Sequence, residues 1–242
     1  MASAVDRAPC FRRAAGIAGG ITAAVLLIFG ILSIICFLAG SDAVMTREIK
    51  RFAPPESTGL SENLYPEMAA HITAFLREEK ESFQYVLPAG DGLVRPLFHN
   101  YELLHMEDCR GLISLAGRVR NIAGGLALLG LLPFFCLKRK EDRQAFATGG
   151  LYALRILSGI AIGAALWATL DFDRFFTAFH RLTFSNDLWL LNPRTDLLIR
   201  LMPEGLFMDL GLWGLGAAGA WLLILSFCFR LMRKTDFRKD EP

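Results

Sequence analysis

The chain has 242 residues, of which 53% are hydrophobic, and its formal net charge is only +2. Its mean hydropathy is positive, which together with long charge-free apolar stretches favours an integral membrane protein over a soluble globular domain. No P-loop, GxGxxG or zinc-ligand pattern occurs, so we expect no cofactor and no metal, and we expect no nucleic-acid partner.

Four apolar stretches are long enough to cross a bilayer as helices: 17–40, 121–137, 144–170 and 210–229. The first carries no charged residue, is longer than the apolar part of a signal peptide, and is followed by no convincing cleavage site, so we predict that it is retained. The third contains one charged side chain, that of Arg155. The prediction is an all-α integral membrane protein with four transmembrane helices.

The distribution of basic residues predicts the side on which each loop lies. With four spans both chain ends share a side, and these ends with the short loop carry 12 Lys and Arg in 35 residues. The opposite side carries 13 in 119 residues, so we expect the denser side to be cytoplasmic. The predicted non-spanning segments are the cytoplasmic 1–16, 138–143 and 230–242 and the two outer loops, 41–120 and 171–209.

The first outer loop, 41–120, has mostly helical character. Ser61 is a candidate N-cap for a helix with apolar residues three and four apart, and "QYVLPAGDGLVRPLF" predicts a turn or short hairpin. The stretch "NYELLHMEDCR" then leads helically into the second span. Its spacing of three puts Glu102, His105 and Asp108 on overlapping faces, where a carboxylate can hold the second imidazole nitrogen for acid–base chemistry.

The second outer loop, 171–209, contains His180 beside Arg181, and Asp196 follows a turn and could cap the next helix. Its aromatic residues are of the kind expected at the level of the lipid headgroups: Phe175, Phe176, Phe179, Phe184, Trp189 and Phe207. We expect the two outer loops to form a mostly helical extracytoplasmic cap over the four spans.

The remaining histidines and the cysteines favour plainer interpretations. We interpret His71, in a surface helix, and His99, in a loop, as structural rather than catalytic. Of five cysteines only Cys109 falls on the outer side, so an intramolecular disulfide and a thiol oxidoreductase activity are not expected.

Several motifs resemble those of one family, the lipoprotein intramolecular transacylases, which are four-span bacterial membrane proteins. The stretch 102–108 matches E-x-x-H-M-x-D, and 184–189 matches F-x-N-D-x-W. P-x-T-D at 193–196 and P-E-x-x-F at 203–207 follow in the family's order. One departure is Cys109, where the family usually has valine.

The resemblance implies a plasma-membrane acyltransferase whose partners are diacylated bacterial lipoproteins and membrane lipids. The family moves the sn-2 acyl chain of an S-diacylglyceryl cysteine to the α-amino group of the same cysteine, which gives the lyso-form lipoprotein. His105 and His180 then supply acid–base catalysis without an acyl-enzyme. The supporting residues expected from these motifs are Glu102 and Asp108, orienting His105, and Arg181 and Asn186, stabilising the oxyanion or holding the loop.

Two other functions fit the same residues. One is a membrane phospholipid acyltransferase or hydrolase that uses the same histidines, and it differs in not needing a free N-terminal cysteine amine. The other is a non-catalytic membrane scaffold, whose biological function would be retained after loss of both histidines.

Overall fold

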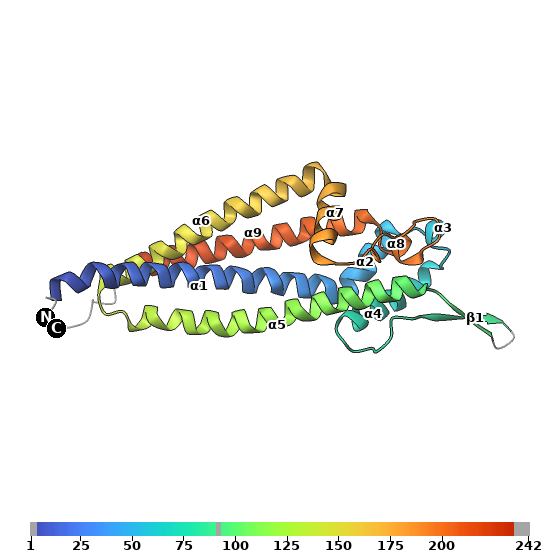
Figure 1. Ribbon diagram of the computed structural model, residues 1–242, viewed down its shortest axis with the longest axis horizontal. Coiled ribbons are helices and arrows are strands. Elements are labelled where there is room, and N and C mark those ends of the chain that lie inside the picture. Colours follow the sequence, from blue (N-terminus) through green and yellow to red (C-terminus); the bar gives the residue numbers. More distant parts are fainter. Residues whose placement is uncertain (1–3, 91–92, 235–242) are drawn as a thin grey trace. The chain divides into compact units, whose positions relative to one another are not determined.

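A computed structural model of the protein describes residues 4–90 and 93–234, and most of these are helical (Figure 1). The elements in chain order are α1 (Ala4–Gly40), α2 (Asp42–Phe52), α3 (Pro55–Thr58), the 3-10 turn η1 (Glu62–Leu64), α4 (Tyr65–Leu76), β1 (Val86–Gly90), β2 (Leu93–Pro96), α5 (Asn100–Cys136), α6 (Lys140–Leu170), α7 (Phe172–Thr183), α8 (Leu197–Leu201) and α9 (Glu204–Lys234). The predicted all-α class is confirmed, with one small hairpin added.

Four of the helices, α1, α5, α6 and α9, are long and apolar enough to cross a membrane, which confirms the four predicted spans. Each is longer than the apolar stretch within it. In particular α5 runs without a break from Asn100 to Cys136, so the motif containing His105 and the second span lie on one continuous helix (Figure 1). The positions at which these helices enter and leave the bilayer stay a prediction.

The chain divides into two compact units, the first formed by the described parts of 1–33, 118–166 and 215–242. Here α1 and α6 approach so closely that a β-carbon on Gly19 would collide with the carbonyl oxygen of Phe146. A β-carbon on Gly149 would likewise collide with the carbonyl oxygen of Gly16. Lipid provides no hydrophobic drive for helix association, so helices in a membrane associate through close packing. Small residues such as these glycines allow the two backbones to approach closely enough.

The second unit, 34–117 with 167–214, has its own apolar core. Helix α4 supplies the centre of this core through fully buried Met68, Ile72 and Phe75, whose spacing gives α4 one apolar face. The prediction that Ser61 is a helix N-cap is only partly right. Ser61 precedes η1 without a side-chain hydrogen bond, and α4 itself begins at Tyr65.

The predicted hairpin is present as the antiparallel pair β1–β2, with Val86 opposite Pro96. Prolines are tolerated in it because both strands are edge strands. At its base, the side chain of Gln84 accepts a hydrogen bond from the backbone N–H of Phe98 and donates one to the Phe98 carbonyl. These bonds hold the chain where it enters α5.

Candidate active site

Glu102 lies in the first turn of α5 and is fully buried, but it does not hold the imidazole of His105 as expected. One carboxylate oxygen accepts from the backbone N–H of His99 at 2.7 Å and from His99 Nδ1 at 3.0 Å. The other accepts from the backbone N–H of Leu198 in α8 at 2.8 Å. Glu102 is therefore the returning half of a capping box for α5, and it also caps α8.

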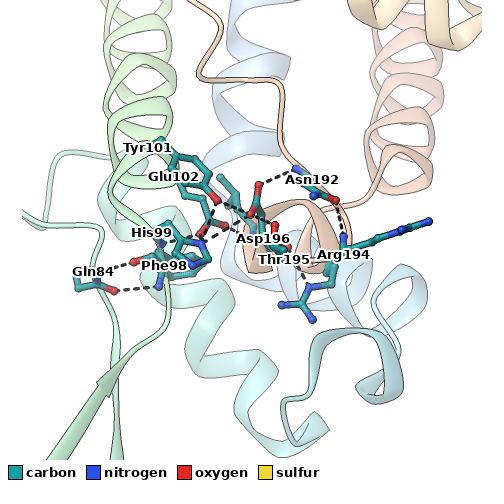
Figure 2. Close-up of polar contacts among 11 residues, drawn as sticks. Gln84, Phe98, His99, Tyr101, Glu102, Asn192, Arg194, Thr195 and Asp196 are labelled. Atoms are coloured by element: carbon teal, nitrogen blue, oxygen red, sulfur yellow. Dashed lines mark hydrogen bonds and ion pairs between the residues drawn. The ribbon is translucent and has the colours of Figure 1, made fainter.

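Asp196 completes this polar cluster from the other outer loop (Figure 2). Its carboxylate accepts from the Tyr101 hydroxyl at 2.6 Å, the Thr195 hydroxyl at 2.6 Å and the Asn192 backbone N–H at 2.7 Å. Burial raises the pKa of Asp196, but these hydrogen bonds together outweigh burial and leave the pKa below its usual range. Asp196 is the predicted N-cap of α8, yet Glu102 binds the first-turn N–H instead.

His105 lies one turn further along α5 and is only 7% exposed. Its ring centroid is 6.1 Å from that of His180, and the edge of Phe184 contacts it at 5.3 Å between centroids. Nε2 lies 3.6 Å from the sulfur of Cys109. Nδ1 is buried and has no hydrogen-bond partner within the described part of the chain. The structure thus brings the two predicted catalytic histidines together.

His180, near the end of α7, has a defined tautomer. Its Nδ1 lies 2.8 Å from the carbonyl oxygen of Phe176, one turn earlier, and only an N–H can bond there. Nε2 of the neutral ring therefore carries the lone pair. Burial lowers the pKa of His180, which the bond to Phe176 offsets only in part, so the ring is neutral near pH 7.

Aromatic rings surround His180. Phe176 and Trp189 lie 4.1 Å and 5.0 Å from it between centroids, and Phe184 lies between the two histidines at 5.6 Å. The sequence predicts that these rings lie at the level of the lipid headgroups, and the structure shows in addition that they pack against His180. The faces of aromatic rings attract a nearby cation, so these rings offset part of the cost that burial adds to a transient imidazolium.

A cavity of about 250 Å³ adjoins the histidine pair through Phe184. Its lining comes from α5 and from the chain that follows α7: Asp108, Gly111, Leu112, Leu115, Thr183, Phe184, Ser185 and Asn186. Asn186 donates to the Asp108 carboxylate at 2.9 Å and so ties the two outer loops together. Two predicted supporting residues therefore line one cavity, although neither has a hydrogen bond to His105.

Other predicted residues lie elsewhere. Arg181 lines a separate open cavity of about 640 Å³ along α7, together with Asp173 and Arg174. His71 does not lie in a surface helix as predicted: α4 is a core helix, and His71 is buried in it with Nε2 2.8 Å from the Phe83 carbonyl oxygen. In residues 4–90 and 93–234, no group of three or more His, Cys, Asp or Glu side chains could hold a metal ion.

Sequence reasoning missed the contacts of Cys109, Phe184 and Trp189 with the histidines. The spacing of four between His105 and Cys109 was a usable signal, since residues so spaced are neighbours on a helix. The positions of Phe184 and Trp189 had no such signal, because both lie in irregular chain after α7.

Comparison with known proteins gives one family and one fold. The family model described as lipoprotein intramolecular transacylase Lit matches residues 20–207. The membrane-integral lipoprotein intramolecular transacylase Lit of Bacillus cereus superposes with a TM-score of 0.69 at 18% identity, over 92% of this chain and 96% of that one.

Two further structures of the Bacillus cereus protein have one histidine replaced. The arginine variant gives a TM-score of 0.64 at 17% identity over 95% of each chain. The alanine variant gives 0.65 at 16% identity, over 96% of this chain and 98% of that one. No curated protein matches the chain significantly in sequence. At these identities the structural similarity shows the fold, and the match to the family model shows the family membership.

Proposed function

Since this chain belongs to the lipoprotein intramolecular transacylase family, a family of acyltransferases, we propose a specific transfer for it. The substrate is a bacterial lipoprotein whose N-terminal cysteine carries a diacylglyceryl thioether and a free α-amino group. The enzyme moves the sn-2 acyl chain from the glycerol oxygen to that amine. The product is a lyso-form lipoprotein, N-acylated and S-monoacylglycerylated.

The observation that carries this proposal is the pairing of His105 and His180 beside a cavity, 6.1 Å apart between ring centroids. The amine nitrogen attacks the ester carbonyl, and Nε2 of His180 accepts a proton from that nitrogen. As the tetrahedral intermediate collapses, the bond between carbonyl carbon and glyceryl oxygen breaks. His180 returns the proton to that oxygen, so the ring finishes as it began.

Amine and ester belong to one substrate molecule, so the protein's main task is to bring them together. Positioning reacting groups about 3–3.5 Å apart contributes several kcal/mol in general. The cavity of about 250 Å³ is smaller than a typical ligand site, which suits the glyceryl and cysteine head while the acyl chains stay in lipid. The Asp108 carboxylate in its wall suits the substrate ammonium before that group loses its proton.

This chemistry belongs on the outer side of the membrane. The proposed topology has cytoplasmic termini, because Lys and Arg are densest in the tails and the short loop. His105 lies 16 residues before the predicted second span, and His180 lies in the second outer loop. Both then face the compartment in which lipoproteins carry their lipidated cysteine.

Isotope labelling tests the proposal. Purified protein is mixed with a lipoprotein carrying labelled acyl chains and an unlabelled lipoprotein of different size, and the products are weighed by mass spectrometry. The label should stay on its own peptide and move to the α-amine. His105→Ala and His180→Ala should each lower the rate by about 10²–10⁴-fold. His71→Gln, the control at a histidine in the core, should stay active. Label crossing between peptides would contradict the proposal.

A further inference from the structure

Cys109 lies one helical turn after His105 on α5, with its sulfur 3.6 Å from Nε2 of that ring. The contact joins a half-buried thiol to a buried imidazole. A spacing of four on a continuous helix keeps the two side chains adjacent whatever the rest of the unit does. The contact therefore joins neighbouring positions of the helix that carries one member of the histidine pair.

The direction of this hydrogen bond follows from the two groups. A thiol has an ordinary pKa of about 8.5, so Cys109 carries its S–H at neutral pH. A neutral imidazole nitrogen with a lone pair is a good acceptor, whereas thiol sulfur is a weak one. The favourable arrangement is S–H donating to Nε2. His105 then carries its own proton on Nδ1.

Nδ1 of His105 is the atom that lacks a partner among the described residues, although it is buried. A buried N–H without an acceptor is costly, so this form of His105 needs an acceptor that the described residues do not supply. His180 presents the complementary group, because its Nδ1–H is bonded to Phe176 and its Nε2 lone pair is left for a substrate proton. The pair therefore offers one donor and one acceptor.

We propose that Cys109 is a positioning residue that holds His105 in the Nδ1–H form, so that His105 donates a hydrogen bond to the oxyanion of the tetrahedral intermediate. The inference rests on the proposed transacylation and assigns different tasks to its two histidines. The transferred proton passes from the amine to His180 Nε2 and then to the glyceryl oxygen. His105 keeps its proton throughout and acts as a neutral electrophile.

The tautomer can be read directly. In the full-length protein with ¹⁵N-labelled histidine, ring nitrogen shifts distinguish the two forms, and His105→Gln identifies the His105 signals. Wild type should show Nδ1–H. Cys109→Val removes the donor and should change the tautomer ratio about two- to tenfold toward Nε2–H, while Cys109→Ser should restore the wild-type form. An Nε2–H ring in wild type, or an unchanged ratio in Cys109→Val, overturns the inference.

Kinetics of the same samples supply the catalytic half. Cys109→Val should stay active but with kcat lowered about two- to tenfold and KM unchanged, and Cys109→Ser should recover the loss. Cys228→Val, at an exposed cysteine of α9, is the matched control and should behave as wild type. Complete loss in both Cys109 variants would indicate a nucleophilic thiol and overturn the assignment.

The two experiments also separate the inference from the proposed function. A chain that converts no lipoprotein, yet has a Cys109-dependent tautomer, would refute the transacylation and with it the catalytic part of the inference. An active enzyme with His105 in the Nε2–H form would refute the role of Cys109 alone.

Discussion

Replacing Glu102 tests whether this buried carboxylate holds the fold or orients a catalytic base. In Glu102→Ala the backbone N–H groups of His99 and Leu198 lose their acceptor while they stay in place. An unsatisfied buried donor costs about 1–3 kcal/mol, and the N–H of Leu198 is buried whereas that of His99 is only part-buried, so the two together should lower the free energy of unfolding by about 2–4 kcal/mol. For a chain of this size, each kcal/mol corresponds to about 2–4 °C in Tm.

Glu102→Gln should cost less, because the amide oxygen still accepts from one of the two N–H groups while the amide nitrogen faces the other. We expect about half the Tm loss of the alanine variant, on the order of 2–8 °C. Glu107→Gln is the matched control on the same helix, since Glu107 is exposed enough that its ion pair with Arg110 contributes about 1 kcal/mol at most.

Thermal unfolding in detergent micelles and lipoprotein conversion well below Tm distinguish the two roles. If Glu102 caps the two helices, Tm should fall by several degrees, while kcat of the folded Glu102→Gln enzyme stays within about tenfold of wild type. A carboxylate that orients His105 would give the opposite result, a Tm close to wild type with activity lower by about 10²-fold or more. That outcome would refute the capping role.

Three further predictions concern pH, substrate charge and topology. Burial lowers the pKa of His180 from its ordinary 6.5, so His180 is already neutral above that pH. The logarithm of kcat/KM should therefore rise with slope one between pH 6.5 and about 7.7, as the substrate amine loses its proton, and with slope two only below pH 6.5. A slope of two above pH 6.5 would contradict the neutral base. Asp108→Asn keeps a partner for Asn186 but removes the charge facing the ammonium, so KM measured at pH 7 should rise about tenfold, and an unchanged KM would place the ammonium elsewhere. In intact cells an impermeant thiol reagent should label a cysteine introduced at 56–62 and miss Cys10, and the reverse pattern would invert the topology.

Local sequence determined the features that depend only on neighbouring residues. The charge-free run 17–40 and the three other apolar stretches are long enough to span lipid, where a single segment satisfies all its backbone N–H and C=O groups by itself only as a helix. Pro88, Gly90 and Pro96 likewise indicated the hairpin before α5. The spacing of four between His105 and Cys109 likewise makes them neighbours on one helix, which is the basis of their contact.

The tertiary structure decided which groups meet. His105 and His180 lie 75 residues apart in the sequence, and only the motif resemblance, not periodicity, paired them before the fold was seen. Periodicity placed Glu102 on the same face as His105, but it could not say which donor the carboxylate would choose. The carboxylate bonds the N–H groups at the start of α5 and of α8, since the first turn of each helix has no internal acceptor and the Leu198 N–H is also buried away from water.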